Sequence, residues 1–496
     1  MNRMITDTVN SSNRKNVIAP TLIGAAVILL MMIMGLLMLL NQGKMITISD
    51  GFFYKIMTLH GTGMVGAGAL AGTAIMYYFL SQYVNVSKKI FVTNIITFLI
   101  GVVMVLIGIF VFDFAAGWTF LYPLPAISGG MWGVAGAVFY LGGMTILGVG
   151  FLLFYLDTGR AIVKKYGNLG NALGWPIIFG KQMKEELPPA VVAGTMVTIV
   201  NTAALVTGAA VLVMSIVNIF NPSFTMDPLF AKNLIYAFGH IFANSIIYMG
   251  VIAVYEVFPK YTGRPWKTYG TFLIAWNAST LFTMIIYPHH LLMDFAMPKW
   301  MLILGQVLSY ANGLPVLVVT AWGALQIIFR SGIKWDMTST LLFSAMFGWV
   351  IGVVPAIIDA TIAVNHVMHN TKWVPGHFHM YMGIGACAMI WGFMYYLMKV
   401  ESIKMVSYFD KLSFWVYLIF FLGLTGSFLY SGKLSAPRRW SQHFPEWVPA
   451  DQLGAVAAMG IIFATSVFIV RFVVSAKHIG TNKVEAETET KEKLYA

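Results

Sequence analysis

The sequence predicts an all-α polytopic membrane protein with twelve spanning helices, and its composition supports that class. Of the 496 residues, 58% are hydrophobic and 10% are charged, whereas a soluble domain is about half apolar and a quarter charged. The mean hydropathy is +0.77. Apolar stretches of about twenty residues, the length that crosses a bilayer, recur along the chain. These values exclude a soluble enzyme, a disordered chain and a nucleic-acid-binding protein, so no nucleic acid is expected as a partner.

The apolar stretches follow one another with short connections. The first is too long for a cleavable signal, and no small-residue cleavage site follows it, so it is expected to be a span. The twelve expected spans are residues 18–42, 52–83, 90–114, 130–156, 189–219, 230–258, 269–288, 299–329, 339–364, 374–398, 410–431 and 452–476. Residues 1–17 are then a cytoplasmic N-terminal tail, and 18–476 form one membrane domain. The polar tail 477–496 is expected to be disordered.

The basic residues set the expected orientation. The net charge is +12, with 31 Lys and Arg against 19 Asp and Glu, and the basic residues lie between the apolar runs. Most of them fall in the termini and after even-numbered spans, so the positive-inside rule predicts a multi-pass cell-membrane protein with both termini cytoplasmic. Membrane lipid is its surrounding partner. The single cysteine, Cys387, excludes an intrachain disulfide framework and a Cys-based metal cluster.

Six of the ten histidines are expected to converge on the outer half of the bilayer. A single intramembrane histidine is as readily a satisfied polar residue between helices as a functional one. Six at one depth are not expected from chance placement. They are His60 in span 52–83, His240 in span 230–258, His289 and His290 at the end of span 269–288, and His377 and His379 at the start of span 374–398.

The spacing of these histidines suits metal ligation. Residues two apart on a helix point about 200° apart, so His377 and His379 face opposite sides of their helix and can serve two metals. Neutral imidazole suits iron and copper and is a usual axial ligand of heme. A six-coordinate heme needs a second histidine from another helix, and His60 lies at matching depth.

The adjacent pair His289–His290 cannot point one way from a regular helix. At a helix end, however, a turn can aim both rings at one metal, and His240 would complete a three-nitrogen site with an open position for substrate. Taken alone, the pair is also compatible with a coincidence at a loop end.

With these motifs in place, the sequence resembles subunit I of the heme–copper oxidoreductases, the superfamily of cytochrome c oxidases and nitric oxide reductases. The resemblance covers nearly the whole chain and implies a twelve-helix heme–copper oxidase subunit I bundle. The region around His377 is most similar to the B-type oxygen reductases. The motifs are LHG at His60, GWTFLYPLP at Gly117–Pro125, FGH at His240, HH at His289–His290, HNTKWVPGHFH at His369–His379, and PRRW at Pro437–Trp440.

The resemblance implies two hemes and one copper. His60 and His379 would hold a low-spin heme that passes electrons, and His377 would be the axial ligand of a high-spin heme. Copper facing that heme would be held by His240, His289 and His290.

The resemblance also implies roles for polar residues at the outer side. Arg438 and Arg439 would pair with heme propionates, because the forked donors of Arg suit carboxylates. Their place on the outer side, which the positive-inside rule disfavours, supports this role over ordinary cytoplasmic charge. His369, Asn370 and Asp294 resemble the polar lid above the propionates. His366 receives no role, and an ordinary interfacial histidine explains it equally well.

One departure from the oxygen reductases affects the expected substrate. The A and B types carry a tyrosine one helical turn after the first copper-ligand histidine, and here that position is Asn244. Tyr248 lies two turns from His240, too far for the cross-link. The C type supplies the tyrosine from the next span, where this chain has Thr283. Both routes to the active-site tyrosine are therefore absent.

The missing tyrosine favours NO over O2 as the gas substrate. Splitting O2 takes four electrons, and the tyrosine supplies one of them, whereas joining two NO into N2O takes only two. Conventional nitric oxide reductases add a glutamate ligand to a nonheme iron. No glutamate lies one turn from His240, and Glu256 is far along the helix, so three imidazoles indicate copper. An oxygen reductase with an altered site remains the alternative.

A proton path from the cytoplasm is expected to include Tyr255. Span 299–329 should add polar groups after Pro315, but Val316–Val319 is apolar, and only Thr320 follows. The path is therefore incomplete, with protons then coming from outside, unless Thr320 and Asn312 serve instead.

Electrons must come from elsewhere, because the chain has neither the Cys pair of a dinuclear copper site nor a CxxCH heme attachment. The expected donor is a partner subunit, a soluble cytochrome or copper protein, or quinol. A twelve-span transporter would share the composition and span count, but it would not require WVPGHFHM or the clustered histidines.

Overall fold

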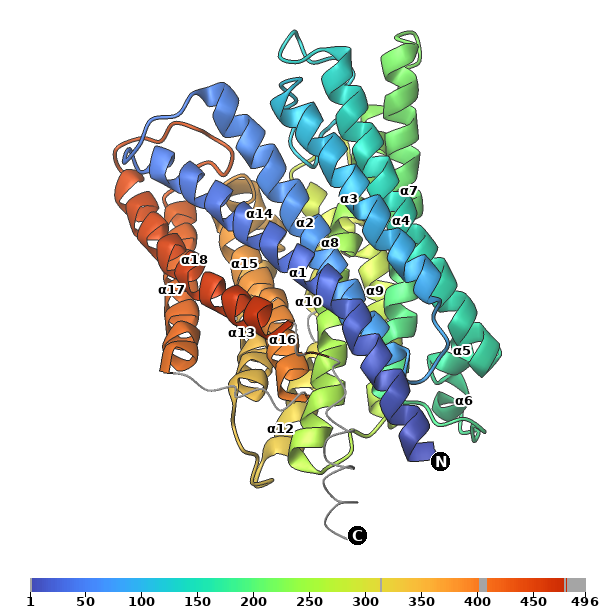
Figure 1. The fold of residues 1–496 in the computed structure, drawn as a ribbon. Helices are drawn as coiled ribbons and strands as arrows, with labels where there is room; N and C mark the ends of the chain where they lie inside the picture. The colour runs from blue at the N-terminus through green and yellow to red at the C-terminus, as the bar shows by residue number, and fades with distance from the viewer. Residues whose placement is uncertain (1, 313–314, 401–407, 477–478, 480–496) are drawn as a thin grey trace.

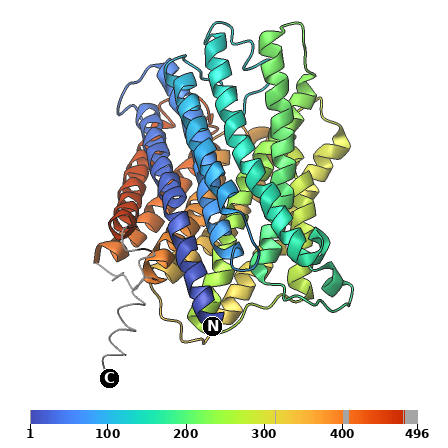
Figure 2. The ribbon, with the colours of Figure 1, turned by 45° about the vertical axis from the view of Figure 1, so that its right-hand side comes forward.

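The computed structural model describes residues 2–312, 315–400, 408–476 and 479, which form a bundle of long helices (Figures 1 and 2). His478 and most of the expected tail 477–496 lie outside the described residues. Eleven helices of the described part are long and apolar enough to cross a membrane. The continuous long helices are α1 (Asn2–Gln42), α2 (Asp50–Leu80), α3 (Lys88–Phe110), α4 (Val134–Tyr166), α7 (Pro189–Phe220), α8 (Pro228–Thr262), α9 (Gly270–Ile285), α13 (Met337–Asp359), α17 (Tyr408–Lys433) and α18 (Val448–Ala476).

Two expected spans are divided into shorter pieces. The span 299–329 comprises α10 (Lys299–Asn312), α11 (Pro315–Leu317), the π-helical η2 (Val318–Trp322) and α12 (Gly323–Ile328). Residues 313–314, between α10 and α11, lie outside the described part of the chain. The span 374–398 comprises α15 (Trp373–His379), the π-helical η3 (Met380–Cys387) and α16 (Ala388–Val400). Eleven of the twelve expected spans therefore match spanning helices of the described residues, and the expected span 299–329 is described only as shorter pieces.

Several helix ends differ from those expected. Helix α1 begins at Asn2, so the segment expected as a tail continues the first helix. Helix α13 begins with a capping box, in which Asp336 accepts a hydrogen bond from the backbone of Ser339. It ends at Asp359, earlier than the expected span, and a separate short helix α14 (Ile362–Met368) follows. The short helices α5 (Leu169–Ala172) and α6 (Trp175–Ile178) lie at the end of the bundle where α1 begins (Figure 1).

The protein core lies along three spans. Buried residues make up 94% of the most apolar stretch of α8 and 83% of those of α2 and of Trp373–Met398, against 28% in α3. Helix α8 contacts α2, α7, α13 and α16. Outer helices present apolar side chains such as Ile96, Val103 and Val213 outward, as lipid requires. The three central spans are the ones that carry His60, His240, and His377 with His379.

Helix α17 packs closely against the start of α15. At Gly432, an added Cβ would lie 2.3 Å from the backbone nitrogen of Trp373, so the two chain segments touch through the missing side chain. Gly426 on the same helix is exposed and has nothing within 4 Å of such a Cβ. Because α15 carries two of the six histidines, this contact positions the candidate site.

We predict that Gly432→Ala destabilises the protein by about 1–3 kcal/mol, since the new methyl overlaps backbone atoms that cannot move aside cheaply. Thermal unfolding of the purified protein measures the loss. Gly426→Ala is the matched control and should be neutral or slightly stabilising, because alanine favours the helix. Equal melting temperatures for both variants would show that the close contact is unimportant.

Candidate metal centre

One cavity of about 820 Å³ brings the predicted site residues together. Its size is within the usual range for ligand pockets, about 300–1000 Å³. All six histidines are half-buried, and they share the lining of this cavity. The predicted site residues in its wall are His60, His240, Asn244, His289, His290, His377, His379, Arg438 and Arg439.

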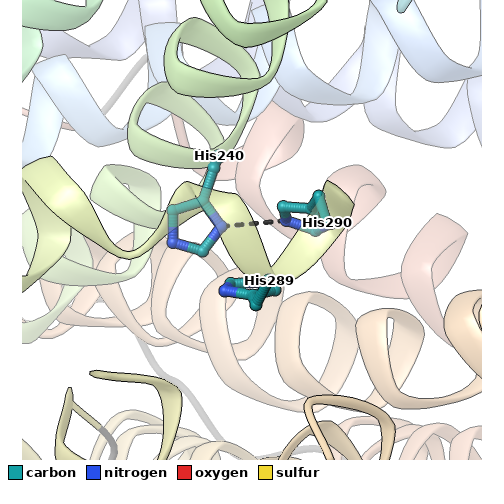
Figure 3. Close-up of side chains that lie close together, drawn as sticks. All are labelled: His240, His289 and His290. Carbon is teal, nitrogen blue, oxygen red and sulfur yellow. Dashed lines mark hydrogen bonds between the residues drawn. The ribbon is translucent and has the colours of Figure 1, made fainter. Parts of the chain in front are cut away.

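Three histidines at one end of the cavity form a compact nitrogen cluster (Figure 3). His240 projects from α8, and Nδ1 of its ring lies 3.0 Å from Nε2 of His290. One ring nitrogen from each of His240, His289 and His290 lies within 4.8 Å of the others. Nitrogens about 2 Å from a shared metal lie at most about 4 Å apart, so a small closure would suit one ion.

The adjacent histidines converge because the helix changes at their position. Helix α9 ends at Ile285, and Tyr287–Leu291 form the 3-10 helix η1. The Nδ1–H of His289 donates to the carbonyl oxygen of Ile286 at 2.9 Å, which leaves Nε2 for the cluster. Helix α10 lies directly against this turn, since a Cβ on Gly305 would be 2.8 Å from the backbone nitrogen of His289.

His60 and His379 form a facing pair from different helices. Their ring centroids are 6.1 Å apart, and the ring planes differ by 14°. Two imidazoles on opposite sides of one iron, each with a metal–nitrogen distance of about 2 Å, have centroids roughly 6 Å apart. Nδ1–H of His60 donates to Met31 and that of His379 to Pro375, each at 2.7 Å to the carbonyl oxygen. Both Nε2 atoms therefore remain available, so the pair fits a six-coordinate heme.

His377 lines the same cavity from the same short helix, α15, as His379. The π-helical segment η3 begins directly after His379. Such segments inside α-helices often occur at functional sites. The two histidines belong to one helical turn and line the same cavity as both other histidine groups. That they face opposite sides of the helix and serve two metals stays a prediction.

The PRRW motif supplies a buried cation. The backbone nitrogen of Arg438 donates to the carbonyl of Asn370 at 3.1 Å, whereas its side-chain Nε is buried without a protein hydrogen-bond partner. Burial, followed by the charge of Arg439, lowers the pKa of Arg438 to about 10, so it remains cationic at neutral pH. Exposed Arg439 donates to Thr119 at 3.1 Å. The unsatisfied Nε facing this cavity fits a carboxylate such as a heme propionate.

The three residues expected as a polar lid, His369, Asn370 and Asp294, differ in burial and in hydrogen-bond partners. His369 is buried, and its Nδ1 lies 3.0 Å from Asp359, while its ring is 5.9 Å from that of His290. Asn370 is exposed. Partial burial is the largest single influence and raises the pKa of Asp294, but the hydrogen bonds from Lys232, Ala296 and Met297 and the charge of Lys232 together lower it. His366 is exposed, as an interfacial histidine would be.

The two residues expected for a proton path contact each other away from the cavity wall. The hydroxyl of Tyr255 lies 2.6 Å from that of Thr320, and Trp276 donates to Tyr255 at 3.2 Å. Both Tyr255 and Thr320 are buried. Asn312 is in the cavity wall instead. The path itself stays a prediction.

Sequence reasoning missed several residues at the cavity. Lys372 is 3% exposed and lines it, although the motif HNTKWVPGHFH contained this lysine. Tyr236 lines it and stacks on His290 with ring centroids 5.7 Å apart. Trp118 contacts Gly61 and Gly239, the glycines beside two of the histidines. The neighbours of these residues in space are far away in sequence, so no local pattern identified them.

Asn244 occupies the position one turn after His240. Its side-chain nitrogen donates to the backbone carbonyl of His240 at 2.7 Å and lies 3.3 Å from each nitrogen of the His240 ring. An amide therefore holds the place beside the three-histidine cluster where the resemblance expects a tyrosine.

Comparisons with known proteins agree with this geometry. The chain is similar to cytochrome c oxidase subunit 1 of Synechocystis sp., at 22% identity over 84% of this chain and 75% of the relative. It is also similar to ubiquinol oxidase subunit 1 of Acetobacter aceti, at 23% identity over 82% and 61%. A heme-copper terminal oxidase dimer solved by cryo-EM shares the fold, with a TM-score of 0.73 at 17% identity over 94% of this chain and 84% of that one.

The family model described as "Cytochrome C and Quinol oxidase polypeptide I" matches residues 15–466, nearly the whole chain. This match excludes the alternative of a twelve-span transporter. The chain therefore belongs to the heme–copper oxidase subunit I family, as its histidine motifs predicted.

Proposed function

We propose that this chain is the catalytic subunit of a membrane respiratory enzyme that reduces NO to N2O. Members of its family are heme–copper oxidoreductases that generally bind two hemes and copper. Here His60 and His379 would hold the low-spin heme, His377 the high-spin heme, and His240, His289 and His290 the copper. When bound, these groups would carry electrons to the gas and bind it.

The observation that carries the choice of gas is Asn244 beside His240. Reduction of two NO molecules by two electrons and two protons gives N2O and water, whereas reduction of O2 to water takes four electrons. An amide cannot be oxidised as a phenol can. Its nitrogen lies 3.3 Å from both ring nitrogens of His240, so the amide occupies the position beside that ring. Asn244 can instead orient the His240 ring and donate a hydrogen bond beside the cluster.

Reduction of O2 to water is the second candidate. The relatives with recognisable similarity are named cytochrome c oxidase and ubiquinol oxidase. Four tyrosines, Tyr54, Tyr236, Tyr248 and Tyr381, also line the cavity. A chain that reduces O2 would have to draw the fourth electron from one of these or from its donor, without the cross-linked tyrosine.

The electron donor is proposed to be another protein or quinol, because the sequence contains no second cysteine and no CxxCH motif. A partner subunit or a soluble cytochrome or copper protein would dock at the end of the bundle that carries Arg438 and Arg439. We place this end outside the cell membrane and both termini in the cytoplasm. Protons would come from the cytoplasm through Tyr255 and Thr320, or from outside if that path is incomplete.

The first prediction of this proposal concerns the heme ligands. His377→Ala should remove the high-spin heme signal and keep the low-spin spectrum, because only the latter has ligands at His60 and His379. His60→Ala should do the reverse. Absorption and electron paramagnetic resonance spectra of the purified variants measure both signals. A low-spin spectrum that survives in His60→Ala would contradict the assignment.

The second prediction concerns the substrate. The purified protein with its partner should consume NO rapidly and O2 slowly when both are measured by electrode on one sample, with about two hemes per copper. Asn244→Tyr should raise the ratio of O2 to NO turnover, because a phenol beside His240 can supply an electron and a proton. Rapid O2 consumption by the unaltered protein would favour the oxidase alternative.

The third prediction concerns the copper. Gly305→Ala should reduce copper occupancy severalfold while both hemes are retained, since the methyl pushes the turn that carries His289 out of place. Metal analysis and heme spectra of one preparation measure the two effects. Gly270→Ala, at the start of α9, meets nothing within 4 Å and serves as the control. Full copper occupancy in both variants would show that the turn tolerates the displacement.

A further inference from the structure

A network of buried polar side chains lies beside the cavity and outside the candidate metal centre. Lys372 forms an ion pair with Asp451, and its Nζ also donates to the side-chain oxygen of Gln42 at 2.8 Å. The other carboxylate oxygen of Asp451 lies 2.6 Å from Nδ1 of His443. The side chains of Lys372, Asp451 and His443 are 4%, 1% and 0% exposed. We refer to Gln42, Lys372, Asp451 and His443 as the Lys372 network.

The charges of the Lys372 network are nearly balanced. Lys372 and Asp451 cancel each other when His443 is neutral, and protonation of His443 leaves one net positive charge. Nε2 of His443 is buried and has no hydrogen-bond partner in the described part of the chain. One imidazole nitrogen is therefore fixed on a carboxylate while the other is unoccupied. This arrangement can gain or lose a proton without breaking its hydrogen bond to Asp451.

The surroundings of His443 contain few other charges. The end of α1 contributes the uncharged Gln42, α18 contributes Asp451, and the segment before α15 contributes Lys372. Ser441 and Gln442 donate to Asp50, the first residue of α2. Glu446, in the loop that carries His443, is exposed.

The Lys372 network is close to the histidine pair proposed to hold the low-spin heme. Gln42 and Lys372 line the same cavity as His60 and His379. Nζ of Lys372 lies 5.4 Å from the centre of the Phe428 ring, and that ring lies 5.2 Å from the ring of His379. A charge buried in protein is screened less than the same charge in water, so it acts over a longer distance.

From this geometry we infer that His443 is a redox-linked protonation site for the electron-carrying heme. The inference rests on the proposed function, in which His60 and His379 hold that heme. When the donor delivers one electron and ferric iron becomes ferrous, the centre loses one positive charge, and His443 takes up one proton on Nε2. When the electron moves on, the proton leaves. No covalent bond other than this N–H forms or breaks.

The proton can exchange with water at the nearby surface. His443 is flanked by the exposed residues Gln442 and Phe444. The loop is anchored to α1, because Asn41 and Gln42 donate to the carbonyl oxygens of Ser441 and Trp440 at 2.9 and 2.7 Å. His443 is therefore held in a fixed position next to surface residues, where it can exchange a proton with water. From there the charge of His443 can interact with the charge of the heme.

The test is a redox titration of the low-spin heme at several pH values, using the whole protein with its partner. The midpoint potential of the unaltered protein should rise as pH falls, because the ferrous state of the heme favours the bound proton. His443→Gln should abolish this dependence and keep the low-spin spectrum. A pH-independent midpoint in the unaltered protein would overturn the inference, whatever the variants do.

A second variant separates a redox-linked proton from a purely structural network. In Lys372→Met, Asp451 loses its cation, so His443 should stay protonated to higher pH and the pH-dependent range should move upward. His366→Gln is the control, since His366 is exposed and should leave the titration unchanged. An unchanged pH dependence in His443→Gln would overturn the inference. Absence of any low-spin heme would instead contradict the proposed function.

Discussion

Backbone carbonyl groups fix the orientation of the histidine rings, and the candidate site depends on this constraint. Three of the six rings donate Nδ1–H to a carbonyl oxygen, those of His60, His289 and His379. A carbonyl only accepts, so each hydrogen bond sets the tautomer and presents Nε2 to the cavity. The carbonyls come from Met31 on α1, from Ile286 at the end of α9 and from Pro375 on α15. The backbone of these helices thus positions three of the six rings.

Two departures from regular α-helix adjoin the cavity for a related reason, whereas the π-helix η2 does not line it. The 3-10 helix η1 and the π-helix η3 adjoin the histidines, whereas lipid-facing helices such as α3 run without interruption. Irregular backbone at membrane depth is tolerated where protein or a cavity surrounds it, because lipid offers no hydrogen bonds. The central spans can therefore carry turns that aim side chains, and the outer helices shield them.

The family and the substrate rest on different residues. The family match places the chain in the heme–copper oxidase subunit I family. The six histidines and the arginine pair stand in the motifs that resemble that family. These residues are compatible with either gas. Asn244 contacts His240 and has no redox chemistry, which supports NO as the substrate. The Lys372 network belongs to neither set of residues. It contacts neither the gas site nor the proposed metal ligands, and we propose that its charge influences electron transfer.

The sequence alone determined the class of fold, the spans and the grouping of the six histidines, because bilayer thickness and helix periodicity act locally. The departure at Asn244 was likewise visible, since it lies one turn from His240. Tertiary structure alone decided that all six rings share one cavity, that Asp359 holds His369, and that Lys372 joins Asp451, His443 and Gln42. Lys372 lies 79 residues from Asp451 and 330 from Gln42, so no local pattern brings these side chains together.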